Sequence, residues 1–163
     1  MNSSWIEFKG EVIAQYQQQK QMAQAALDRV DDATFFAHLK QGGDAESNSI
    51  AILIKHISGN FISRWSDFLT SDGEKADRQR PREFVHEASD NRPQIMERWE
   101  EGWRRLFATL ESLTEEDFAK TVYIRDEAHS ELKAILRNLL HTTHHIGQID
   151  LLATVFKNQD GAA

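Results

Sequence analysis

Three histidines lie within five residues near the end of the chain, at positions 141, 144 and 145. Leucines and isoleucines flank them, and no Asp, Glu, Lys or Arg occurs between Arg137 and Asp150. Such a segment is typical of a buried helix. An imidazole is costly to bury unless its nitrogens find partners. A divalent metal ion is a partner that would explain the cluster.

Helical geometry leaves two histidine pairs open as metal ligands. His141 and His145 are four residues apart, which places both side chains on one face of a helix. This is the spacing at which one helix offers two imidazoles to a metal ion. His144 is three residues from His141 and could pair with it instead. The positions of the histidines alone do not decide between the pairs.

A third ligand must come from elsewhere in the chain, and His56 is the best placed of the four other histidines. It lies in a predicted helix, on a polar stripe within an otherwise apolar segment, as expected of a face that lines a cavity. The stripe also contains Ser49, Asn60, Ser63 and Asp67. His38, His86 and His129 fall near predicted segment ends or in loops, where we expect solvated side chains. His129 is a partial exception, because it precedes the last predicted helix.

Helical periodicity and capping residues predict four long helices. The predicted helices cover residues 4–30, a second segment from a cap at Ser47 or Asn48 to about Leu69, a third that begins near Asp90 or Asn91 with Pro93 in its first turn, and a fourth from a cap at Ser130 to about Lys157. Gly42, Gly43 and Asp44 are expected to break the chain between the first two.

The connections predict smaller elements. Residues 70–73 end the second helix, and a polar loop follows to about Ala88. Residues 114–117 resemble a helix start and predict a short extra turn, while the β-branched and aromatic residues 121–124 predict a short strand or hairpin. We therefore predict an all-α fold, an up-down four-helix bundle with a short extra helix or hairpin before the last helix. Residues 1–163 are expected to form one domain.

The last predicted helix is apolar on nearly every side from Leu139 to Phe156. A helix of this kind is buried nearly all round. A four-helix bundle of this size covers only part of such a helix. We therefore expect a second burial surface, most simply a homodimer interface.

Composition excludes several classes of protein. Hydrophobic residues make up 40% and charged residues 28% of the chain, as in soluble globular proteins, and no apolar run is long enough to span a membrane. The formal net charge of −7 argues against nucleic-acid binding, and we expect the group around Arg78, Arg80 and Arg82 to be a solvated loop. The N-terminal segment does not read as a signal peptide, so we expect a cytoplasmic protein. There is no cysteine, so any thiol must arrive with a substrate or cofactor.

The histidine pattern resembles that of the DinB/YfiT-like family of metal-binding four-helix bundles. Members commonly carry one histidine on the second helix and a His-x-x-x-His element before a Gly-Gln dipeptide on the last helix, here His141 to His145 followed by Gly147 and Gln148. The resemblance implies that His56, His141 and His145 are the metal ligands and that His144 is extra. Residues 65–75 and 123–125 resemble a less characterised branch, known mostly as proteins of unknown function.

Better-understood relatives in that family are metal-dependent transferases or an isomerase that use low-molecular-weight thiols such as bacillithiol or mycothiol. The resemblance therefore implies a thiol S-transferase acting on a small electrophilic substrate. Zinc or nickel fits the all-nitrogen site best, with iron and manganese as alternatives. Asn60 and Gln148, each near one helical turn from a ligand, are expected to orient ligands or substrate.

Two other functions are compatible with the same residues. One is a metal-dependent hydrolase in which the nucleophile is a metal-activated water. The other is a non-enzymatic dimer that binds a metal or another ligand, in which the histidines serve stability alone.

Overall fold

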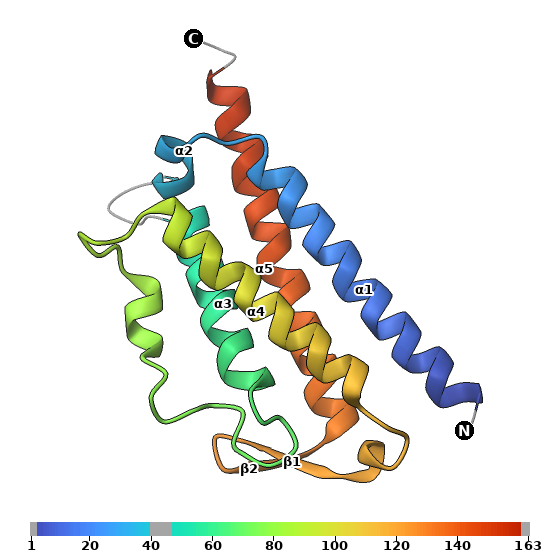
Figure 1. Cartoon of the computed structure of the whole chain (residues 1–163). Helices are drawn as coiled ribbons and strands as arrows, with labels where there is room; N and C mark the ends of the chain where they lie inside the picture. The colour runs from blue at the N-terminus through green and yellow to red at the C-terminus, as the bar shows by residue number, and fades with distance from the viewer. Residues whose placement is uncertain (1–2, 40–46, 161–163) are drawn as a thin grey trace.

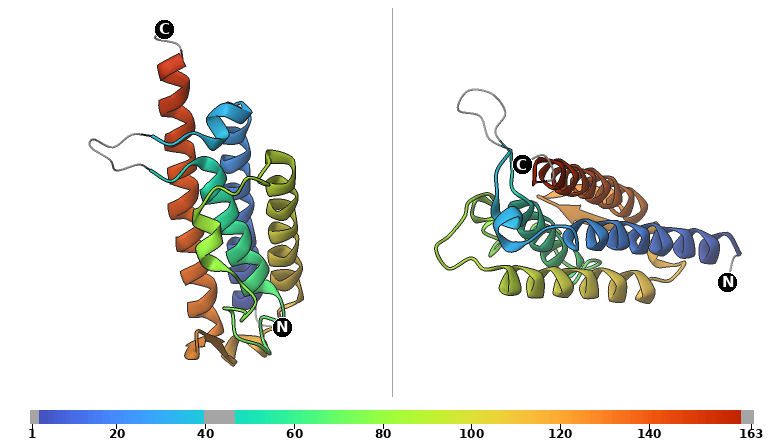
Figure 2. Two further views of the ribbon diagram at one scale, coloured as in Figure 1. Left: turned by 90° about the vertical axis from the view of Figure 1, so that its left-hand side faces the viewer. Right: turned by 90° about the horizontal axis from the view of Figure 1, so that it is seen from above.

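The computed structural model describes residues 3–39 and 47–160, so the predicted break at Gly42–Asp44 lies outside the described residues. The described part is mainly helical, and four long helices lie side by side (Figures 1 and 2). These are α1 (Ser3–Leu27), α3 (Ile50–Trp65), α4 (Arg92–Ser112) and α5 (Glu131–Asp160). Among the described residues, no helix has both the length and the apolar character that a bilayer span requires.

Shorter elements lie in the connections between the long helices. They are α2 (Asp32–Phe36), the 3-10 helices η1 (Arg80–Phe84) and η2 (Asp117–Ala119), and strands β1 (Thr121–Ile124) and β2 (Glu127–Ser130). The predicted extra turn and hairpin before the last helix are both confirmed. The polar loop predicted up to Ala88 contains η1, which no pattern in the sequence predicted.

Side-chain caps set the starts of the helices. Asn91 accepts a hydrogen bond from the backbone N–H of Gln94, which confirms the predicted start of the third helix near this residue. Ser130 accepts one from the backbone N–H of Lys133, which confirms the predicted cap of the last helix. The prediction for the second helix was wrong by one or two residues, because Ser49 caps α3. The hydroxyl of Ser47 instead accepts a hydrogen bond from the backbone N–H of Leu39, before the α3 cap.

The second predicted helix ends earlier than expected, at Trp65 rather than near Leu69. Asp67 has a φ of 49°, in the left-handed region that stops a helix. Its carbonyl accepts hydrogen bonds from the backbone N–H groups of Thr70 and Ser71, both at 3.0 Å. This local turn satisfies the backbone that a longer helix would have used.

A carboxylate ties the loop after α3 to the hairpin before α5. Strands β1 and β2 are antiparallel, with Val122 opposite His129. Arg125 and Asp126 form the turn, with φ values of 56° and 63°. Asp72 accepts hydrogen bonds from both of their backbone N–H groups, at 2.9 and 2.8 Å. The start of α5 is thereby held close to the end of α3.

Aromatic rings pack against one another within the core. Trp65, Trp99 and Trp103 are buried, and the ring of Phe61 packs edge-on against Trp103 with centroids 4.8 Å apart. The core cluster draws its residues from all four long helices and from β1.

One side of α5 remains exposed, although its composition predicted burial nearly all round. Leu140 is 72% exposed, Leu151 61% and Leu136 40%. The other helices therefore cover only part of the apolar surface of α5 in a single chain. The predicted homodimer interface stays a prediction.

Glu131, the first residue of α5, is completely buried, and neither of its carboxyl oxygens has a hydrogen-bond partner among the described residues. Burial and the nearby charge of Asp117 raise the pKa of Glu131 to about 7. The folded protein therefore keeps a proton that the unfolded chain releases near pH 4.5. The contribution of Glu131 to folding stability therefore falls as the pH rises between these two values.

We predict that Glu131→Gln removes this pH-dependent loss of stability. The variant should be more stable than the parent protein at pH 8, by up to about 3 kcal/mol, with the difference shrinking towards pH 5. Urea unfolding of both proteins at pH 5, 6, 7 and 8 measures the effect. A difference in unfolding free energy that is the same at every pH would show that ionisation of Glu131 is not its cause.

Candidate metal centre

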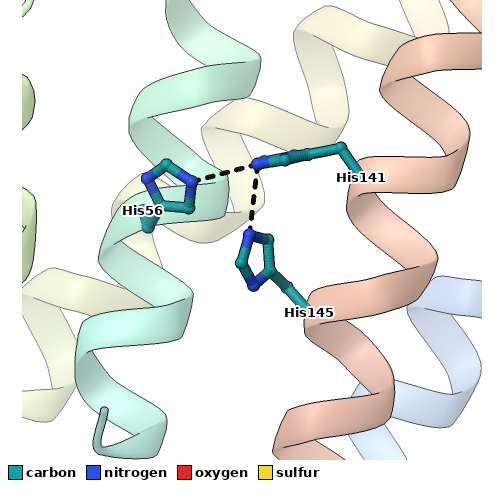
Figure 3. A group of neighbouring side chains, drawn as sticks. All are labelled: His56, His141 and His145. Carbon is teal, nitrogen blue, oxygen red and sulfur yellow. Dashed lines mark hydrogen bonds between the residues drawn. The ribbon is translucent and has the colours of Figure 1, made fainter.

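Three histidines from two helices converge between α3 and α5 (Figure 3). His56 comes from α3, and His141 and His145 come from successive turns of α5. The Nε2 atom of His141 lies 3.0 Å from that of His56 and 3.1 Å from that of His145. One nitrogen from each residue lies within 4.8 Å of the other two. The structure thus brings together the three histidines that the resemblance selected.

Hydrogen bonds at Nδ1 determine which nitrogen of each ring is free. The Nδ1–H of His56 donates to the carboxylate of Glu83 at 2.8 Å, so in the neutral ring Nε2 carries a lone pair. The Nδ1–H of His145 donates to the side-chain oxygen of Gln148 at 2.7 Å, which leaves its Nε2 with a lone pair as well. Both lone pairs point towards Nε2 of His141 (Figure 3).

His141 cannot satisfy both neighbours. Its Nε2 carries at most one proton, so at least one of the two facing lone pairs has no donor. Its Nδ1 is buried without a hydrogen-bond partner among the described residues. Three converging nitrogens that share at most one proton cannot all be paired by hydrogen bonds among themselves. A bound cation would accept their lone pairs instead.

The spacing of the nitrogens agrees with this interpretation. Nitrogens bound at about 2.0–2.1 Å to one tetrahedral zinc ion lie about 3.4 Å apart. The observed separations of 3.0 and 3.1 Å need only a small opening of the rings to reach that value. The donor set therefore fits a divalent metal that accepts imidazole ligands.

The electrostatic environment keeps the α5 histidines neutral. Burial, and then the repulsion that protonated His145 and His56 would exert, lowers the pKa of His141 to about 3. Burial also lowers the pKa of His145, although its hydrogen bond to Gln148 acts in the opposite direction. Neutral imidazoles are the form that binds a metal, so both rings are ready to act as ligands at neutral pH.

Glu83, which was not among the predicted site residues, orients His56 from the side opposite α5. It lies in η1, is buried, and accepts a forked pair of hydrogen bonds from Arg78, both at 2.7 Å. Burial alone would raise the pKa of Glu83, but the hydrogen bonds from His56 and Arg78 outweigh it and lower that pKa. The ionised carboxylate can only accept, which holds His56 in one tautomer.

Gly59 makes room for this carboxylate. A Cβ atom at position 59 would lie 2.1 Å from Oε1 of Glu83, far closer than atoms can approach. The missing side chain lets η1 lie against α3 and bring Glu83 to His56. Phe84, the next residue, places its ring against His56 with centroids 4.7 Å apart. In the sequence, a glycine inside a buried helix indicates that another segment packs closely there. It does not indicate that this segment is the one that contains Glu83.

The two predicted orienting residues have different surroundings. Gln148 contacts the ligand His145 directly. Asn60 instead accepts a hydrogen bond from the amide of Asn138 at 2.7 Å, and Asn138 accepts one from Tyr16 at 2.9 Å. Within residues 3–39 and 47–160, no hydrogen bond joins Asn60 to any of the three histidines. Asn60 therefore belongs to a buried network one turn away from them.

Two expectations about solvated side chains were wrong. His129 is only 6% exposed, because it shares the inward face of the hairpin with Val122. The side chain of Arg78 is 5% exposed, because its guanidinium turns inward and forms an ion pair with the buried carboxylate of Glu83. His144 and His86 are exposed, and His38 is half-buried. Asp67, a weaker candidate on the α3 stripe, is exposed beyond the end of that helix.

Comparison with known proteins gives one match. A family described as "Protein of unknown function (DUF1572)" matches residues 3–162, nearly the whole chain. No curated protein and no solved structure matches the chain.

We predict that Gly59→Ala destabilises the protein by about 1–3 kcal/mol, because the new methyl group displaces the carboxylate of Glu83 from above α3. Gly10 in α1 and Gly147 in α5 are matched controls, since a Cβ at either would meet nothing within 4 Å. Alanine at these positions should leave stability unchanged or raise it by up to about 1 kcal/mol. Urea unfolding compares the three variants. Equal stability of Gly59→Ala and Gly147→Ala would contradict the packing argument.

Proposed function

The chain belongs to the DUF1572 family of proteins of unknown function, and we propose that it holds a divalent metal ion on His56, His141 and His145. One observation carries this proposal. The three Nε2 atoms converge. The hydrogen bonds that Glu83 and Gln148 accept from Nδ1–H leave the Nε2 atoms of His56 and His145 free to act as ligands. Zinc and nickel are the metals that suit three imidazoles best.

We assign the fold to the DinB-like up-down four-helix bundles. The side-by-side arrangement of α1, α3, α4 and α5 supports this assignment. So does the His-x-x-x-His-x-Gly-Gln element on the last helix, with its distant partner His56 on α3.

The function we propose is a thiol S-transferase acting on a small electrophile. A metal held by three histidines keeps an open position and lowers the pKa of a thiol or water bound there. The chain supplies no thiol of its own, so the nucleophile must come from solution. His141 and His145 are half-buried, which leaves the site reachable from the α5 side, whereas His56 is 3% exposed.

The surrounding side chains contribute orientation. Glu83 and Gln148 each hold one histidine ring by its Nδ1–H, so that the free Nε2 faces the site. The ring of Phe84 covers His56 and keeps water from that side of the imidazole. These roles require no movement of the helices.

The metal itself gives the first test. Protein purified without an affinity tag should contain about one divalent metal per chain by elemental analysis. His56→Ala and His141→Ala should lose it, and Glu83→Gln should weaken affinity by about 10–100-fold, because a ligand loses its hydrogen-bond partner.

His144→Ala is the matched control, since His144 is an exposed histidine on the same helix. This variant should retain the metal. A metal-free protein whose unfolding is unaffected by chelators would refute the proposal, and so would equal metal loss in His144→Ala and His141→Ala.

Activity gives the second test. Metal-loaded protein should consume low-molecular-weight thiols in the presence of small electrophiles, and His56→Ala should abolish this turnover. Thiol consumption and product mass are the measurements. Turnover of model esters without added thiol would point instead to the hydrolase, with a water in place of the thiol. A metal without an exchangeable position and no turnover in either assay would favour the non-enzymatic alternative.

A further inference from the structure

A cavity of about 740 Å³ lies between α3, α4 and the connection that carries η1. This volume is within the range of about 300–1,000 Å³ that is typical of small-molecule sites. The carboxylate of Glu83 lines the cavity and also accepts the Nδ1–H of His56, whereas Nε2 of His56 faces His141 on α5. The cavity therefore lies on the Nδ1 side of His56, and none of the three histidines lines it.

The charged side chains that line this cavity are not balanced. Six of them are cationic and four are acidic, although the chain as a whole has a formal net charge of −7. Three of the acids each form an ion pair with a lining cation, and these pairs are Lys55 with Asp90, Arg78 with Glu83 and Arg82 with Glu87. The fourth acid, Asp77, is exposed. Lys75, Arg98 and Arg105 are therefore cations that no carboxylate of the lining pairs with at close range.

Two of these cations are tied to the same part of α3. Nη1 of Arg105 donates a hydrogen bond to Oγ of Ser66, and the backbone N–H of Lys75 donates one to Oγ of Ser63 at 2.8 Å. Ser63 and Ser66 are three residues apart, so they are neighbours on the surface of α3, and both line the cavity. Lys75 and Arg105 therefore reach the cavity from the same end.

The two arginines of α4 have donors to spare. Arg98 lies seven residues before Arg105 on the same helix face, which is about 10 Å along the axis. The guanidinium of Arg98 has neither a hydrogen bond nor an ion pair among the described residues. Arg105 uses Nε on Glu101, a carboxylate that it shares with Arg104, and its Nη2 makes no hydrogen bond to any described residue.

Lys75 is the third cation with unused donors. Its ammonium donates to the carbonyl of Asp72 at 2.6 Å, which leaves two of its three N–H groups without a partner in the described part of the chain. Burial lowers the pKa of Lys75 more than the nearby charges of Asp67, Asp72 and Asp77 raise it. The surrounding carboxylates therefore compensate only in part for the water that the half-buried ammonium has lost.

We propose that this cavity binds a small organic anion, whose carboxylate or phosphate group accepts hydrogen bonds from Lys75, Arg98 and Arg105. An anionic acceptor would use the donors that these three side chains leave free. Ile62, which is half-buried, and Ile95, which is 4% exposed, also line the cavity and offer an apolar wall to the rest of the molecule. The site is separate from the three histidines, and the proposal stands without the proposed function.

Benzoate and phenyl phosphate are suitable probes, because each joins one anionic group to one apolar ring. Binding to the full chain is measured by titration calorimetry at constant ionic strength. We expect the parent protein to bind at least one of them, and a preference would identify the anionic group as a carboxylate or a phosphate. Benzyl alcohol, an uncharged counterpart, should bind at least about 10-fold more weakly, because it offers the cations no charged acceptor. Equal affinity for benzyl alcohol, or no binding of either anion, would overturn the proposal.

Substitutions test the assigned residues. Arg98→Met and Lys75→Met should each weaken binding of the anions by about 10-fold, because each removes a charged hydrogen-bond donor. Arg98 has no partner to lose among the described residues, so the urea midpoint of Arg98→Met should match that of the parent protein. Arg104→Met is the matched control, since Arg104 is an exposed arginine on the same helix that does not line the cavity. Unchanged affinity in Arg98→Met and Lys75→Met, or an equal loss in Arg104→Met, would refute the site.

A metal-ligand variant keeps the two proposals apart. His141→Ala and chelator-treated parent protein should bind the anions as tightly as untreated parent protein, because His141 does not line the cavity. Binding that is lost together with the metal would place the probes at the three histidines and would overturn the separate site. Anion binding that depends on Arg98 in a protein that holds no metal would support the cavity site and refute the metal centre.

Discussion

The hydrogen bond between His56 and Glu83 is the interaction on which the candidate site depends. The carboxylate of Glu83 lies against α3 at Gly59, where any side chain would collide with it. The guanidinium of Arg78 also donates to this carboxylate and holds it in place. By accepting the hydrogen bond from Nδ1–H, Glu83 leaves Nε2 of a buried histidine facing α5 as an acceptor. Without that bond, His56 would have no fixed tautomer, and Glu83 of η1 would lose its hydrogen bond to α3.

The same constraint, that buried polar groups must find partners, sets the register of the helices. Tyr16 of α1, Asn60 of α3 and Asn138 of α5 form a chain of hydrogen bonds through the core. Burial raises the pKa of Tyr16 well above its usual value, so it remains a donor. A shift of α5 by one turn would leave these groups unpaired. The network therefore specifies which residues of α5 face His56.

Local signals in the sequence predicted much of the fold, and their failures have local causes. Asn91 and Ser130 cap helices as predicted, because each side chain needs only its own backbone. The second helix starts at a different cap because the hydroxyl of Ser47 is used by Leu39. The exposure of Leu140 on α5 was likewise outside the reach of periodicity, because periodicity shows which sides are apolar but not how many neighbours cover them.

The sequence by itself determined the helical pattern and the residue types on each face. Spacing along a helix places His141 and His145 on one face, and the polar stripe on α3 pointed to His56, because helical repeats translate directly into position. Only the tertiary structure decided that Glu83 meets His56, that Arg78 is buried rather than solvated, and that Nε2 of His141 lies 3.0 Å from that of His56. Glu83 and Arg78 lie in the connection between α3 and α4, which has no periodic pattern from which their positions could be predicted. The third depends on the register between two helices, which no residue pattern within one helix contains.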